Sequence, residues 1–138
     1  MAYIEKYNSF EPINEASRIS GKEIVYHGTS NNAWKKKYGN ESTLFLTVDL
    51  SAAQGYADEM VECELLDEIK SKPVVYSITI SQLKNISSIT LEADWGAKGM
   101  KEDKTWQDSF LKYGSFSIHG PIDDIKKKFD LVKVKADF

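Results

Sequence analysis

One long helical pattern lies near the middle of this chain, between short runs of apolar residues. Asp49 or Ser51 can cap its N-terminus, and the pattern extends to about Ile69. Apolar residues recur at helical spacing and predict a buried stripe formed by Ala53, Tyr56, Ala57, Met60, Val61 and Leu65. Gly55 interrupts this helix at a cost of about 1 kcal/mol relative to alanine. We therefore expect a ligand or another stretch of backbone to approach Gly55 closely.

The apolar runs on either side of this helix predict β-strands. They lie at residues 23–27, 44–47, 74–80, 116–118 and 131–134. A turn and a further short strand are expected over residues 83–91, a long mixed loop over residues 92–107, and a short helix over residues 123–129. Because strands outnumber helices, the sequence predicts the α+β class. The 138 residues suit one domain, expected over residues 22–138, after a loosely packed arm over residues 1–21.

The composition is that of an ordinary globular protein, with a formal net charge of −3. Two short basic runs, residues 35–37 and 126–128, predict solvated faces, and without a broad basic field nucleic acid is not favoured as a partner. Because Cys63 is the single cysteine, one chain can hold neither a disulfide nor a cysteine-ligated zinc ion. No apolar run reaches the ~18 residues of a membrane span, and the N-terminus lacks the apolar segment of a secretory signal. We expect a cytoplasmic, monomeric protein that holds no metal.

The residues Tyr26-His27-Gly28-Thr29 end the first predicted strand and are the first candidate for a binding site. A ring nitrogen of His27 can hydrogen-bond a sugar hydroxyl. Gly28 has no Cβ, so a planar amide can approach its backbone N–H and C=O closely. An ordinary turn with a partly buried histidine would have the same sequence, so the neighbouring motifs must decide between the two interpretations.

Two aromatic residues and two acids extend this candidate site. Phe45 lies in the second predicted strand and Tyr56 on the helix, eleven residues later. Their rings could hold a flat heterocycle, at about 0.5–1.5 kcal/mol per ring pair beyond burial. Glu92 and Asp94 follow the third predicted strand and its turn, where a carboxylate could stabilise positive charge developing at the anomeric carbon of a sugar. Together these residue types predict cleavage of a nicotinamide glycoside, whereas each taken singly also fits a core or a solvated position.

These motifs resemble those of the ADP-ribosyltransferase fold in its His-Tyr-Glu (diphtheria-toxin-like) branch, most closely the small rifampin ADP-ribosyltransferases. The tetrad at residues 26–29 resembles the first motif of that branch, and Phe45-Leu46-Thr47 through Ser51 to Tyr56 resembles the second. Leu91-Glu92-Ala93-Asp94 lies where those enzymes carry an acidic segment that ends in the catalytic Asp. Residues 116–122 resemble their late strand, which ends in glycine, so the resemblance spans roughly residues 23–135.

The resemblance implies a compact fold of two packed small β-sheets, one main helix and short flanking helices. It implies a mono-ADP-ribosyltransferase that uses NAD⁺ as co-substrate, releases nicotinamide and modifies an unidentified protein, nucleic acid or small molecule. It assigns NAD⁺ binding to His27, Gly28, Thr29, Phe45 and Tyr56. It assigns catalysis to His27 and Asp94, with Glu92 as the substitute acid.

Two departures from the family pattern keep other functions open. The strand tyrosine of the family falls on Phe45, and the late glutamate of other members would fall near Ser115 or Ser117. One alternative is therefore a catalytically inactive domain of the same fold that binds a partner protein. Another is an RNA 2′-phosphotransferase-like activity, which needs basic residues around a phosphate, and near the tetrad only residues 35–37 are basic.

The N-terminal arm suggests a biological setting. Phe10-Glu11-Pro12-Ile13-Asn14-Glu15 is similar to the leader of internal head proteins of large tailed phages, which a prohead protease would cut after Glu15. This similarity implies that the protein is packaged with a phage genome and acts in the cytoplasm of a bacterial host.

Overall fold

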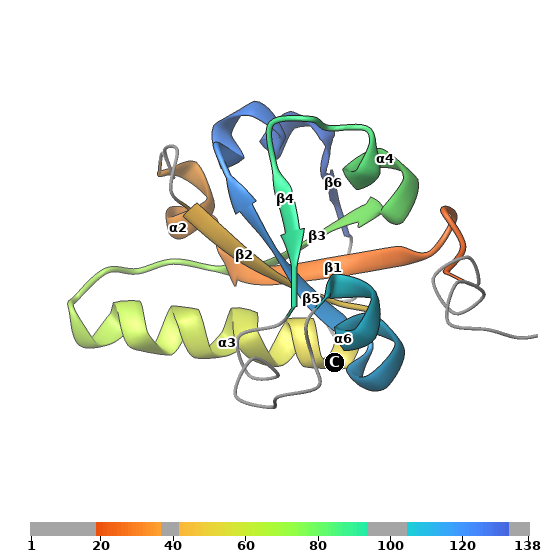
Figure 1. Cartoon of the computed structure of the whole chain (residues 1–138). Coiled ribbons are helices and arrows are strands. Elements are labelled where there is room, and N and C mark those ends of the chain that lie inside the picture. The colour runs from red at the N-terminus through yellow and green to blue at the C-terminus, as the bar shows by residue number, and fades with distance from the viewer. Residues whose placement is uncertain (1–18, 37–41, 94–104, 133–138) are drawn as a thin grey trace, which may run out of the picture.

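The computed structural model describes residues 19–36, 42–93 and 105–132. It has the α+β architecture that the sequence predicts, with six antiparallel strands in the order β4-β5-β2-β1-β3-β6 (Figure 1). The strands are β1 (Ile24–Ser30), β2 (Ser42–Thr47), β3 (Pro73–Thr79), β4 (Thr90–Glu92), β5 (Ser115–Gly120) and β6 (Asp130–Leu131). Asp94 and the leader-like segment at residues 10–15 lie outside the described residues.

The two separate sheets that the resemblance implies are not observed, because all six strands belong to one sheet. The link between its halves is narrow. β1 pairs with β3 from Ile24–Thr79 to Ser30–Pro73, whereas β1 and β2 share the single residue pair Tyr26–Thr47. Beyond this pair β1 and β2 part, and Figure 1 shows β1 running across β2 and β5 rather than alongside them.

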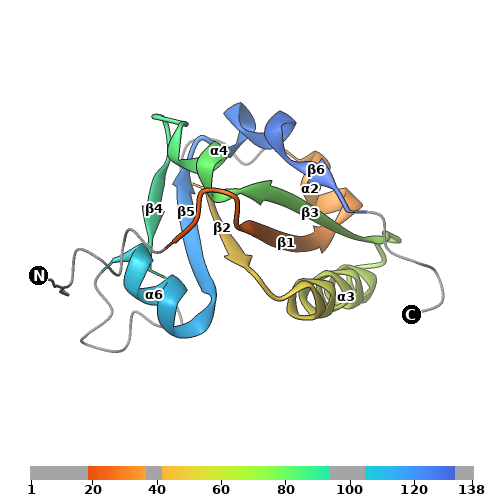
Figure 2. The same cartoon turned by 90° about the vertical axis from the view of Figure 1, so that its right-hand side faces the viewer.

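Helices cover both faces of the sheet. The long helix α3 (Leu50–Leu66) begins at Asp49, whose carboxylate accepts a hydrogen bond from the Ala52 N–H. It packs on β1 and β3, and Figure 2 shows α4 (Ile80–Lys84) and the turns η1 (Ile122–Asp124) and η2 (Lys126–Lys128) on the opposite side. The short helix α2 (Asn31–Lys35) follows β1 directly. In the parts of the chain that the structure describes, no helix is long and apolar enough to cross a membrane.

Two expectations about the C-terminal part are wrong. The helix expected over residues 123–129 forms as the two separate 3₁₀ turns η1 and η2. The loop expected up to residue 107 ends earlier, because a helix that the sequence analysis missed, α6 (Trp106–Tyr113), begins within it. Thr105 caps its start, and Gly114 ends it with a positive φ of 70° that suits glycine.

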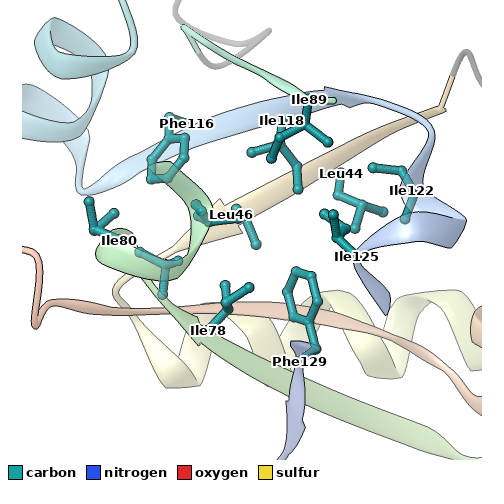
Figure 3. Packing of buried hydrophobic residues seen from close by; sticks show 12 residues of the cluster. Leu44, Leu46, Ile78, Ile80, Ile89, Phe116, Ile118, Ile122, Ile125 and Phe129 are labelled. Carbon is teal, nitrogen blue, oxygen red and sulfur yellow. The ribbon is translucent and has the colours of Figure 1, made fainter. Parts of the chain in front are cut away.

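The main hydrophobic core lies on the sheet face opposite α3. Figure 3 shows Leu44 and Leu46 of β2 facing Ile78 of β3, with Ile122, Ile125 and Phe129 closing one side. Ile19, from the arm expected to be loosely packed, contacts this cluster, and the Gly21 C=O accepts a hydrogen bond from the Ser81 N–H. The arm is therefore attached to the domain at least over residues 19–21.

The apolar stripe of α3 is only partly buried, contrary to expectation. Ala53 and Ala57 are buried against β1 and β3, but Tyr56 and Met60 are 44% and 38% exposed. The small alanines allow the helix to approach β1 at Gly28, where a Cβ would overlap the Ala53 carbonyl oxygen and lie 3.1 Å from the Ala57 nitrogen. Close packing of helix and strand is therefore one reason for a glycine at this position.

Gly55 does not have the close neighbour that the sequence led us to expect, because a Cβ built there meets no atom within 4 Å. The glycine that another stretch of backbone approaches closely is Gly28 of β1, the strand on which α3 packs.

The two glycines predict opposite effects of the same substitution. Gly28→Ala should lower the free energy of unfolding by about 3 kcal/mol, because α3 must move away from β1. Gly55→Ala should raise it by about 1 kcal/mol, because alanine fits the open space and favours the helix. Urea unfolding of both variants checks this, and equal effects of the two substitutions would contradict the described packing of α3 on β1.

Candidate functional site

The candidate site begins where β1 and β2 part. The Val75 C=O accepts a hydrogen bond from the Val132 N–H, so the polar backbone groups of Val75 point towards β6. Gly28 lies opposite Val75, and in an antiparallel ladder its own N–H and C=O must then point the other way, towards β2. Extension of the Tyr26–Thr47 register would place Phe45 opposite Gly28, but the two strands are not paired there. The sheet thus presents the Gly28 amide to an opening.

His27 of β1 lies next to this opening. Its Nδ1 lies 2.9 Å from the Phe45 carbonyl oxygen, which can only accept, so Nδ1 carries the proton. Burial lowers the pKa of His27 below its usual 6.5 and outweighs the opposite effect of this hydrogen bond. The imidazole is therefore neutral near pH 7, and its Nε2 is an acceptor.

An aromatic stack accounts for the burial of His27. The Trp34 ring lies 6.0 Å from the His27 ring and 4.0 Å from the Tyr76 ring, on which it stacks. Phe129 meets the Trp34 ring edge-on, and Lys126 Nζ lies 5.5 Å from its centre. These side chains exclude water from one side of the imidazole, and burial also raises the pKa of Tyr76.

A cavity of about 540 Å³ lies at the opening. It is lined by His27, Gly28, Phe45, Tyr56, Glu59, Met60 and Cys63. The strands β1 and β2 contribute the first three, and the last four lie on one face of α3 at helical spacing. The structure therefore brings four of the five residues predicted to bind NAD⁺, His27, Gly28, Phe45 and Tyr56, to one place.

Two aromatic rings form one wall of the cavity. The rings of Phe45 and Tyr56 meet edge to face, with centres 5.1 Å apart and planes at 80°. A flat ligand sandwiched between them would need about 7 Å, twice the contact distance of ~3.5 Å. Tyr56 is 44% exposed on α3, so its side chain can turn outward without disturbing the core.

The remaining predicted residues lie apart from this cavity. Thr29 is buried at 2% exposure on β1 and does not line it, while its neighbour Ser30 caps α2 by accepting from the Ala33 N–H. Glu92 lies on β4 opposite Ser117 of β5, which in turn lies opposite Phe45 of β2. Cross-strand partners share a face, so Glu92 is on the face of Phe45, but about 10 Å away at ~4.8 Å per strand.

Ser117 also bears on the departure from the family pattern. It is the residue of β5 directly opposite Phe45, and it is buried with 1% of its surface exposed. A late glutamate at this position would lie next to the cavity wall, and serine cannot supply its charge. Among the described residues predicted to be catalytic acids, this leaves Glu92, since Asp94 lies outside them.

A polar network fixes α3 relative to β1. Glu64 accepts hydrogen bonds from Ser71 Oγ at 2.6 Å and from Asn32 Nδ2 at 2.9 Å. Hydrogen bonds from Ser30, Ser71 and Asn32 lower the pKa of Glu64, so the carboxylate stays ionised near neutral pH. These bonds join the C-terminal half of α3 to α2, which follows β1 directly, and to the segment that precedes β3.

The two basic runs come together near His27. Lys126 Nζ donates to the Lys36 carbonyl oxygen at 3.2 Å and covers Trp34. Lys127 and Lys128 are exposed, as expected of a solvated face, and none of these lysines lines the cavity. The second histidine, His119, lies on β5 and bonds Thr43 Oγ1 at 2.8 Å, so it belongs to the sheet and not to the site.

Three lining residues were not predicted from the sequence: Glu59, Met60 and Cys63. They follow Tyr56 at positions i+3, i+4 and i+7, the spacing of one helix face. That spacing could have found them once Tyr56 was chosen. In the described residues no group of three metal-ligating side chains gathers here or elsewhere.

No protein-family model matches this chain, and no curated protein or solved structure is significantly similar to it. The resemblance to ADP-ribosyltransferases therefore rests on the motifs and on the arrangement of their residues, and it stays a prediction.

His27 predicts a pH dependence of stability. Its pKa is lower in the folded than in the unfolded chain, so the unfolded chain binds more protons below pH 6.5. The free energy of unfolding should be fully retained above that pH and should fall as the pH drops through the folded pKa. Urea unfolding between about pH 5 and 8 measures it. His27→Gln should remove this component, and an unchanged pH dependence in that variant would assign it to another group.

Proposed function

We propose that the cavity binds the nicotinamide end of NAD⁺ and that the protein transfers ADP-ribose to an acceptor. The observation that carries this proposal is the convergence of a neutral histidine, a glycine backbone and two aromatic rings on one cavity. These are the three kinds of group that a ribosyl nicotinamide requires: an acceptor for a ribose hydroxyl, a partner for the carboxamide and a surface for the ring.

The backbone of Gly28 suits the carboxamide. Its N–H and C=O point into the opening, so they can donate to the carboxamide oxygen and accept from the carboxamide nitrogen. His27 Nε2 would be the acceptor for a ribose hydroxyl, since Nδ1 already donates to the Phe45 carbonyl oxygen. Both contacts use atoms that the fold holds rigidly, which keeps the entropic cost of binding low.

The nicotinamide ring would enter between Phe45 and Tyr56. Because their rings are in contact, Tyr56 must turn away before the ligand can stack on Phe45. Phe45 is anchored on β2 between β5 and the opening, so the mobile partner is Tyr56 on the helix surface. Binding therefore includes one change of side-chain rotamer, on a timescale of about nanoseconds.

The transfer itself needs a carboxylate. As the bond between the ribose carbon and the ring nitrogen breaks, its electron pair goes to the nitrogen and neutral nicotinamide leaves. The ribose carbon becomes positively charged until a nucleophile of the acceptor binds it, and a nearby carboxylate lowers the free energy of that state. We assign this role to Asp94 or to Glu92, which lies on the same sheet face as Phe45.

The alternative is a domain of the same type that binds a partner protein without catalysis. It is favoured by the contact between Phe45 and Tyr56 and by the serine opposite Phe45 on β5. Calorimetric titration separates the two functions, because binding of NAD⁺ supports the enzyme and no heat of binding at millimolar NAD⁺ supports the inactive domain.

Tyr56 gives a direct test of the proposed site. Tyr56→Ser removes one stacking surface and should weaken NAD⁺ binding about tenfold, the equivalent of ~1.4 kcal/mol of ring contact. Release of nicotinamide should fall with it. The matched control is Tyr113→Ser on α6, which removes an equally exposed tyrosine that does not line the cavity.

Thermal shift with NAD⁺ and chromatographic measurement of nicotinamide provide the two readouts for both variants. If Tyr56→Ser binds NAD⁺ and releases nicotinamide as the unmodified protein does, the site assignment is wrong.

A further inference from the structure

Among the lining residues that the structure describes, the cavity has one acidic residue with a carboxyl side chain, Glu59. It lies one helical turn after Tyr56, on the face of α3 that borders the cavity. No hydrogen bond or ion pair joins Glu59 to another described residue, whereas Glu64 on the same helix is held by Ser71 and Asn32. The Glu59 carboxylate therefore holds no other described residue in place, and it lies at the edge of an aromatic cavity.

The surroundings of Glu59 reinforce its charge. α3 contains Asp58, Glu59, Glu62 and Glu64 and no lysine or arginine. His27, the other titratable base of the cavity, is neutral near pH 7 because burial lowers its pKa. The basic runs lie around Trp34 and do not line the cavity. The charged side chains of α3 are therefore all acidic, and Glu59 is the one among them that lines the cavity.

The aromatic wall favours the same kind of ligand. The faces of Phe45 and Tyr56 carry partial negative charge and attract a cation placed over them. A ligand that is both flat and positively charged would gain from the rings and from the Glu59 carboxylate at once. A flat neutral ligand would gain from the rings alone.

From this we infer that the cavity is selective for a planar cation and that attraction by the Glu59 carboxylate produces this selectivity. The nicotinamide ring of NAD⁺ is such a cation, whereas the ring of NADH and free nicotinamide are neutral. The inference rests on the proposed function for the identity of the dinucleotide, and the selectivity for charge rests on the cavity alone. It gives Glu59 a role in specificity, distinct from the acid assigned to the transfer step.

The probes are 1-methylnicotinamide, a planar cation, and nicotinamide, its neutral counterpart with the same carboxamide. We expect the unmodified protein to bind the cation about tenfold more tightly, from the combined effect of the rings and an exposed carboxylate. Glu59→Gln should reduce this ratio to about threefold. Glu62→Gln removes the same charge from the same helix outside the cavity and should lower the ratio less than Glu59→Gln does.

Protein-detected NMR titrations at low salt give the six affinities, two for each of the three proteins, and show whether each variant is folded. Equal affinity for the two probes, binding of neither, or equal ratios in the two variants would overturn the inference. A parallel titration with NAD⁺ and NADH tests the proposed function separately. Selective binding of the cation without binding of NAD⁺ would support the inference and contradict the proposed function. Binding of NAD⁺ without a preference for the cation would support the proposed function and contradict the inference.

Discussion

The site depends on one residue pair, Tyr26–Thr47, which joins the two halves of the sheet. After this pair β1 stays with β3, and β2 stays with β5, so the two strands part. A continuous ladder would use the Phe45 carbonyl and the Gly28 amide for strand pairing. Because the ladder stops, the Phe45 carbonyl oxygen accepts a hydrogen bond from the His27 imidazole, and the Gly28 backbone faces the cavity. A defect in sheet pairing therefore supplies the polar groups of the site.

The helix α3 makes this arrangement rigid on one side and adaptable on the other. Its alanines rest on Gly28, where a larger residue would push the helix away, and Glu64 ties its far end to Asn32 and Ser71. The same helix presents Tyr56 and Met60 to the cavity with much of their surface exposed. Gly28 thus has two reasons to be glycine: α3 packs against the position that a Cβ would occupy, and a ligand can approach its backbone.

The sequence predicted the local features well and the long-range ones poorly. Asp49 as a cap and the β-branched run of β3 are local signals, and the structure places a helix and a strand there. Helix α6 was missed because it has only eight residues, its helical pattern rests on the apolar pair Trp106 and Phe110, and it adjoins a mixed loop. The union of all strands in one sheet depends on the single Tyr26–Thr47 pair, which no local pattern specifies. For the same reason sequence spacing could not show that Glu92 lies two strands from Phe45.

The central claim is that the opening between β1 and β2 receives a nicotinamide ring, and NMR of the protein with NAD⁺ tests it most directly. The account predicts that the amide signal of Gly28 shifts saturably and that nuclear Overhauser effects connect nicotinamide protons with the rings of Phe45 and Tyr56. If NAD⁺ binds but these signals stay unchanged while other parts of the chain respond, the cavity at Gly28 is not the binding site.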